Sequence, residues 1–227
     1  MRTTRLIAGT VSAGLLGLAP IAIAAPSQAA DTWTTTTVAT PSAAQLEYGD
    51  DFYVSVDLSS SDGYSPGGTD GTVTLMAMEA GSSAWVPVAT AENTYASFYD
   101  VKPRMNTSYK VVYSGFTDPD QGTYGDNYTP SESAPFTIGV ARKITAPSSG
   151  FVIKGKVTPD YANKKIVIKV SKKEKKGYKG WKTIKTNGKG KYKVRLPRRG
   201  GTWYWTFTTK ADAKYLANGF GWRTWVS

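Results

Sequence analysis

The chain has no cysteine and no histidine among its 227 residues. Without cysteine there are no disulfides, no thiol nucleophile and no lipidated N-terminal cysteine. Without histidine there is no histidine-based catalytic triad, and zinc lacks both of its commonest ligands. A carboxylate-pair hydrolase stays formally open, but it needs a deep cleft, which small β-domains with short loops rarely offer. We therefore expect a protein that is not an enzyme, with no catalytic residues, no metal and no cofactor.

Helix signals are nearly absent too, because no stretch of 11 or more residues repeats apolar positions with helical spacing. Short alternating runs separated by Gly, Pro, Asn and Asp dominate instead, and these are typical of antiparallel β-sandwiches. The predicted strands cover residues 52–56, 72–76, 109–113, 151–157, 166–170, 192–196 and 203–207.

Long apolar runs are limited to Leu6 to Ala24, which follows Arg2 and Arg5. A basic start, an apolar run and small residues predict a secretory signal peptide over residues 1–29. Cleavage after Ala24 and cleavage after Ala29 both fit, and the alternative is an uncleaved membrane anchor. With no second such run and no sorting motif, we expect an extracellular protein that is not in the membrane after processing, and any attachment to the cell surface to be noncovalent.

Acidic residues are scarce after residue 140. Residues 31–140 carry 14 acidic and 3 basic side chains, net −11, whereas residues 141–227 carry 3 acidic and 23 basic ones, net +20. About 100 residues suffice for a domain with its own core. The charge split therefore predicts an acidic domain over 30–140 and a basic domain over 141–227, with a short linker around Val140 to Ala146.

The two halves repeat one pattern. Gly71 to Leu75, a turn and Trp85 to Thr90 match Lys165 to Ile168, a longer turn and Trp181 to Thr186. An aromatic-rich strand follows in each half. Each half thus resembles the bacterial immunoglobulin-like repeat domains of secreted actinobacterial proteins. The resemblance implies an all-β fold of two tandem antiparallel Ig-like or fibronectin-III-like β-sandwiches after the signal peptide, but it implies little about function, because such modules serve as spacers, adhesin segments and binding domains.

Lysines depart from this pattern in the second half. Strand alternation places the side chains of Lys154 and Lys156 on the face opposite to that of the apolar Ile153 and Val157. The outer faces are therefore expected to be positively charged. The stretch from Ser171 to Gly180 predicts a flexible basic loop. The candidate polyanion-binding residues are Lys172, Lys173, Lys175, Lys176, Tyr178, Lys179, Lys182, Arg198 and Arg199.

Three uses of this charge are open. Clustered cations bind anionic polymers by releasing their counterions, which predicts a partner such as wall teichoic acid, extracellular DNA or an acidic polysaccharide, without sequence-specific nucleic-acid recognition. A lysine coat also favours solubility, although a net charge of about 2 to 8 suffices for that in a small domain. Alternatively, the acidic and basic domains dock on each other, within one chain or between chains, and give a structural or self-associating protein.

Two further features have a functional and a structural interpretation. Trp222 and Trp225 are three residues apart on a predicted strand, so one of them is a candidate platform for stacking a sugar ring, or packs on the other domain. The loop Asp118 to Asp126 has three carboxylates at positions of a calcium loop but lacks its glycine and its final glutamate. Ordinary turn chemistry accounts for it better.

Overall fold

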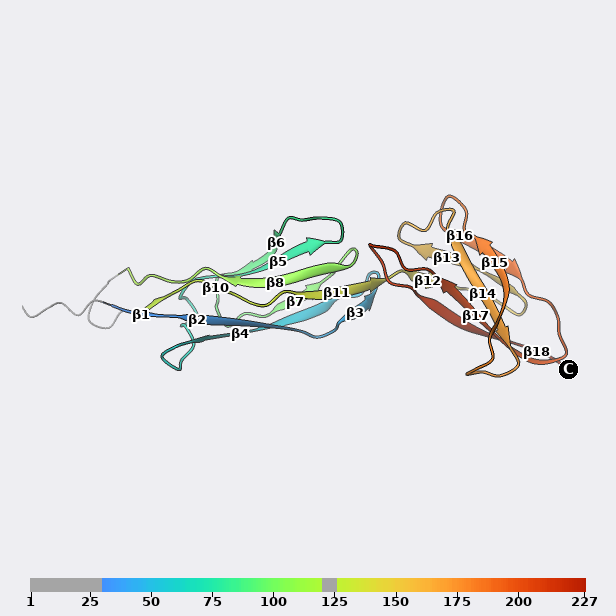
Figure 1. The fold of residues 1–227 in the computed structure, drawn as a ribbon, viewed down its shortest axis with the longest axis horizontal. Helices are drawn as coiled ribbons and strands as arrows, with labels where there is room; N and C mark the ends of the chain where they lie inside the picture. The colour runs from blue at the N-terminus through green and yellow to red at the C-terminus, as the bar shows by residue number, and fades with distance from the viewer. Residues whose placement is uncertain (1–29, 120–125) are drawn as a thin grey trace, which may run out of the picture.

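The computed structural model describes residues 30–119 and 126–227. The predicted signal peptide, residues 1–29, and residues 120–125 of the considered calcium loop lie outside the described residues. The described part contains strands but no helix, and so no helix long and apolar enough to cross a membrane. Figure 1 shows two β-sandwiches arranged end to end along the long axis.

The first sandwich packs a three-stranded sheet, in the order β2-β4-β7, against a larger sheet in the order β3-β11-β8-β5-β6, with β10 added beside β8. A short parallel pair, β1 with β9, lies outside these two sheets. The strands are β1 (Asp31–Trp33), β2 (Thr35–Pro41), β3 (Gln45–Glu47), β4 (Phe52–Ser60), β5 (Val73–Glu79), β6 (Val86–Ala91), β7 (Phe98–Val101), β8 (Thr107–Tyr113), β9 (Asp126–Tyr128), β10 (Ser131–Glu132) and β11 (Phe136–Ala141).

The second sandwich packs the sheet β12-β13-β16 against the sheet β15-β14-β17-β18. Its strands are β12 (Lys143–Thr145), β13 (Val152–Thr158), β14 (Lys165–Ser171), β15 (Lys179–Lys185), β16 (Lys191–Arg195), β17 (Gly201–Thr209) and β18 (Gly219–Val226). The order β8-β5-β6 in the first sandwich corresponds to β17-β14-β15 in the second. The repeated sequence pattern thus occupies the same place in both sandwiches, and the predicted all-β fold of tandem Ig-like domains is confirmed.

Each sandwich has its own core, because one face of its central strands is apolar. In β8 the alternate residues Tyr109, Val111 and Tyr113 are buried, and Phe52 meets Tyr109 edge to face at 5.3 Å between ring centroids. In the second sandwich Trp205 is fully buried, lies 5.0 Å from Trp181, and donates its indole N–H to Thr224 Oγ1. Aromatic pairs of this geometry contribute packing energy beyond their buried area.

The junction between the sandwiches is built from strand residues rather than a free linker. Arg142 alone separates β11 from β12, and it is 1% exposed. The segment after β17 leans back on the first sandwich, where Leu216 donates its backbone N–H to the Val140 carbonyl at 2.8 Å. Asn106 accepts the N–H of Val140 through its side-chain oxygen, and its own backbone N–H is donated to the Lys214 carbonyl. These backbone contacts connect the two sandwiches over several residues around the short linker expected over 140–146.

Candidate anion-binding surface

The loop between β14 and β15 is held by hydrogen bonds from its own residues. Ser171 donates its hydroxyl to the Lys176 carbonyl at 2.6 Å and accepts the backbone N–H of Lys173 at 2.9 Å. Tyr178 donates its hydroxyl to the Glu174 carbonyl at 2.7 Å. Gly177 has a φ of +75°, a conformation that costs glycine little and other residues more. The loop therefore presents its lysines from a defined turn.

Three loop lysines, Lys179 at the start of β15 and one arginine surround a shared groove of about 490 Å³. The groove, here called the loop groove, has Trp203 as its aromatic wall. The guanidinium carbon of Arg199 lies 4.6 Å from the Trp203 ring centroid, and Lys172 Nζ lies 5.3 Å from it. Cations over an indole ring are attracted by its quadrupole and lose conformational freedom before any ligand arrives. The cations of the loop groove are Lys172, Lys173, Lys176, Lys179 and Arg199.

The remaining predicted residues do not line this groove. Lys175 is exposed on the loop, and Tyr178 donates its hydroxyl to the Glu174 carbonyl within the loop. Lys182 lies within β15, with its ammonium 6.0 Å from the Trp181 ring. Arg198 points elsewhere, with its guanidinium carbon 5.4 Å from the Phe151 ring. Lys179, which does line the groove, is the first residue of β15 and not part of the loop.

Trp222 and Trp225 face opposite sides of β18, because the β17–β18 register runs without a bulge at Gly221. Trp222 packs against the core of the second sandwich and donates its indole N–H to the Gly150 carbonyl at 3.1 Å. Trp225 is 66% exposed. Of the two candidate stacking groups, the structure presents the ring of Trp225 to solvent.

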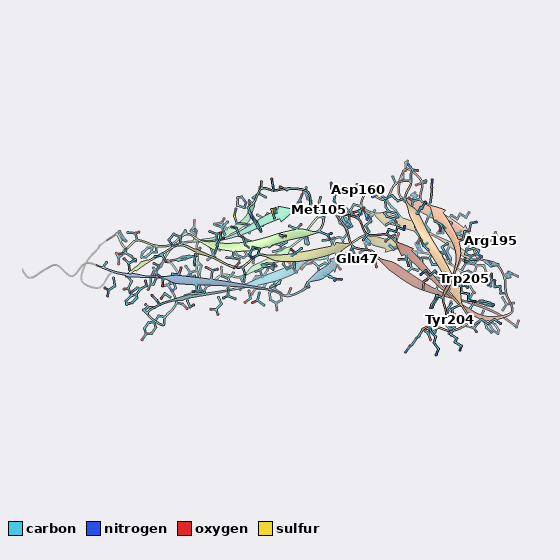
Figure 2. The ribbon with its side chains drawn as sticks, in the orientation of Figure 1. Glu47, Met105, Asp160, Arg195, Tyr204 and Trp205 are labelled. Carbon is cyan, nitrogen blue, oxygen red and sulfur yellow. The ribbon has the colours of Figure 1, made fainter. Side chains whose placement is uncertain are left out.

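A second basic pocket, of about 740 Å³, lies against the outer face of the sheet β12-β13-β16. Its cations are Lys154, Lys156, Lys185, Lys191 and Lys193. In Figure 2 the neighbouring Arg195, also on β16, lies on the side of the second sandwich away from Glu47, which marks the junction. Sequence alternation assigned Lys154 and Lys156 to the outer face, but it gave no reason to join the five lysines into one site, because strand register cannot be deduced from alternation alone.

Most of this positive charge has no ion-pair partner among the residues that the structure describes. Between the described residues there are four ion pairs, and only Arg142, Lys143 and Lys164 supply their cations in the second sandwich. One carboxylate, Asp212, serves both Arg142 at 2.6 Å and Lys164 at 3.0 Å. The loop groove and the second pocket therefore keep nearly all of their charge for a ligand. Within residues 30–119 and 126–227, no group of three acidic side chains is placed to hold a metal ion.

Comparisons with known proteins give a fold likeness. No family model matches the chain, and no curated protein matches it. Among solved structures, it is similar to a two-domain fibronectin type-III segment from chicken tenascin, at 10% identity and a TM-score of 0.41, over 82% of this chain and 97% of that one. It is also similar to the FN1–FN3 domains of chicken CNTN1, at 13% identity and a TM-score of 0.31, over 86% and 67% of the two chains. A third similar structure is the human OSCAR ligand-binding domain, at 15% identity and a TM-score of 0.27, over 82% and 95%.

Proposed function

We propose that this protein is a secreted, non-catalytic binding protein whose basic C-terminal sandwich engages anionic extracellular polymers. Wall teichoic acid, extracellular DNA and acidic polysaccharides are the candidate partners. The observation that carries the proposal is the loop groove, which five cations line and where two of them, Lys172 and Arg199, lie over one indole ring. The resemblance of the sequence to repeat domains of secreted actinobacterial proteins supports an extracellular setting.

The electrostatics favour a polymer over a small anion. A net charge of +20 over residues 141–227 is well above the value of about 2 to 8 that solubility needs. Each cation that contacts a polyanion releases condensed counterions, and the affinity then falls with salt in proportion to the number of contacts. A polymer can contact the groove and the lysines around it at once, whereas a small anion is limited to a few of them.

The test is a salt titration of the chain from residue 30 onward against DNA, teichoic acid and a neutral glycan. The variant K172E/K173E/K176E reverses three charges in the loop groove, and K189E/K210E/K214E makes the same net change elsewhere on the second sandwich. We expect the groove variant to flatten the slope of log affinity against log salt by about 3 units. The proposal is wrong if both variants lose affinity and slope equally, because only net charge then matters.

A second candidate is a self-associating protein in which the acidic sandwich of one molecule meets the basic sandwich of another. The opposed net charges of −11 and +20 favour it. Among the described residues a single ion pair, Lys143 with Glu47 at 3.5 Å, joins the two sandwiches of one chain, so the loop groove is not covered from within. Sedimentation at low and high salt tests this, because such oligomers dissociate as salt screens the charges.

A further inference from the structure

Three pairs of lysines face each other directly across neighbouring strands. On β13 and β16, Lys154 is opposite Lys193 and Lys156 is opposite Lys191. On β14 and β15, Lys165 is opposite Lys185. Residues in register across antiparallel strands have Cβ atoms about 4.5–5.5 Å apart, and like charges at these positions destabilise the sheet. We call the four lysines of β13 and β16, Lys154, Lys156, Lys191 and Lys193, the lysine ladder.

No acidic side chain of the described residues relieves this repulsion by an ion pair. None of the ladder lysines is ion-paired with another described residue. Residues 141–227 contain three acidic residues, Asp160, Glu174 and Asp212, and Asp212 is engaged by Arg142 and Lys164. A surface selected only for solubility gains nothing from placing its lysines in direct opposition. The arrangement therefore indicates a function that compensates for its cost to stability.

The ladder lines one wall of the pocket of about 740 Å³, and Lys185 reaches the same pocket from β15. Polar groups beside the ladder are already engaged. Tyr192 donates its hydroxyl to the Thr145 carbonyl at 3.0 Å, and Thr145 accepts the backbone N–H of Lys156 through its own hydroxyl. The ammonium groups are thus the main unengaged donors in the pocket, and the site is suited to charge rather than to hydroxyl recognition.

We propose that the lysine ladder binds an extended chain of phosphate groups that lies along β13 and β16. This inference rests on the proposed function and specifies the chemistry of the polymer. A strand rises about 3.3–3.4 Å per residue, so successive lysine pairs lie about 6.7 Å apart and the ladder presents on average one cation per about 3.4 Å. One strand of DNA carries about one negative charge per 3.4 Å, and a chain of phosphates therefore matches the ladder in linear charge density.

The chemistry of lysine agrees with this choice. An ammonium is a compact point charge and a common phosphate ligand, whereas arginine is preferred where a carboxylate or a phosphate is bound through two parallel hydrogen bonds. The pocket is lined by five lysines and by no arginine among the described residues. Two lysines in register on neighbouring strands can place an ammonium donor on either side of one phosphate.

The decisive variant is K154E/K156E in the chain from residue 30 onward. It converts both opposed pairs into cross-strand ion pairs with Lys193 and Lys191. We expect its Tm without ligand to rise by about 2–6 °C, because repulsion becomes attraction. We expect its affinity for inorganic polyphosphate to fall at least about tenfold and its salt slope to fall by about 3 to 4 units, since two cations are lost and two are neutralised.

The control variant K210E/K214E has the same net charge and leaves the ladder intact. If K154E/K156E binds polyphosphate as the control does, while K172E/K173E/K176E loses binding, then the ladder inference is overturned and the proposed function survives. If K154E/K156E loses heparin but not polyphosphate, the ladder is a site for sulfated glycans and the phosphate assignment is wrong. If the unmodified chain binds no polyanion at all, the proposed function fails, and the ladder inference fails with it.

Discussion

The guanidinium of Arg142 donates a hydrogen bond of 2.6 Å to Asp212 Oδ2 at the point where the two sandwiches meet. The same guanidinium lies 4.2 Å from the Tyr215 ring centroid and 5.0 Å from that of Tyr161, and its Nε donates to the Pro159 carbonyl. Its Nη1 is buried without a hydrogen-bond partner in the described part of the chain. A buried charge with few partners depends strongly on those it has. The burial of Arg142 at the junction therefore depends strongly on Asp212.

Replacing Asp212 by Asn removes the negative partner of the buried guanidinium. We expect the free energy of unfolding to fall by about 1–3 kcal/mol, because one buried charge loses its charged acceptor. Denaturant unfolding monitored by tryptophan fluorescence measures this. Glu174→Gln is the control, since Glu174 is an exposed loop acid with no ion pair among the described residues. Equal destabilisation by the two variants would contradict the role assigned to Asp212.

The same carboxylate makes stability depend on acid pH. Burial alone raises the pKa of Asp212, but hydrogen bonds from Arg142 and Lys164 outweigh it and lower the pKa from 3.8 to about 2. Because the pKa is lower in the folded than in the unfolded state, the stabilisation is complete above pH 4 and is lost as the pH falls toward 2. Unfolding curves at pH 5, 4, 3 and 2 should show the difference between the wild type and Asp212→Asn shrinking in that window. A stability difference that stays constant over these pH values would contradict the predicted role of the Asp212 carboxylate.

Gly155 lies between the two ladder lysines of β13 and allows β12 to approach closely. A Cβ at this position would lie 1.7 Å from the Thr145 carbonyl oxygen, a backbone atom that cannot move aside alone. We expect Gly155→Ala to destabilise the protein by about 1–3 kcal/mol through overpacking. Gly188→Ala is the control, because nothing lies within 4 Å of its Cβ position. Thermal unfolding of the two variants measures the destabilisation. Similar Tm values would show that β12 shifts to accommodate the added methyl group at little cost.

Replacing Trp225 distinguishes a role in ligand stacking from a role in structural packing. Its side chain is 66% exposed, so Trp225→Ala should change the free energy of unfolding by less than about 0.5 kcal/mol. If the ring stacks on a sugar, the affinity for a glycan polymer falls about three- to tenfold. Glycan titrations of wild type and variant at one salt concentration provide the measurement. Unchanged affinity for every glycan that binds would assign no stacking role to this ring.

Several strands could be predicted from the sequence because their two faces have opposite chemistry. Residues 151–157 and 192–196 alternate apolar and basic side chains, and the structure places strands there within one residue. The loop groove was partly predictable, since Lys172, Lys173, Lys176 and Lys179 are close in sequence. Trp203 lies in a predicted strand, but its contact with Lys172 and Arg199 depends on how β17 passes beside the loop, which no local pattern encodes.

The sequence by itself determined the all-β fold, the repetition of one sandwich, and the division of charge between the two halves, because periodicity, turn residues and composition are local properties. The tertiary structure alone decided which lysines face each other across strands, since register depends on the pairing of β13 with β16, distant in the sequence. It also decided that Arg142 is buried at the junction, because the aromatic rings and the carboxylate around it come from segments that are brought together only by folding.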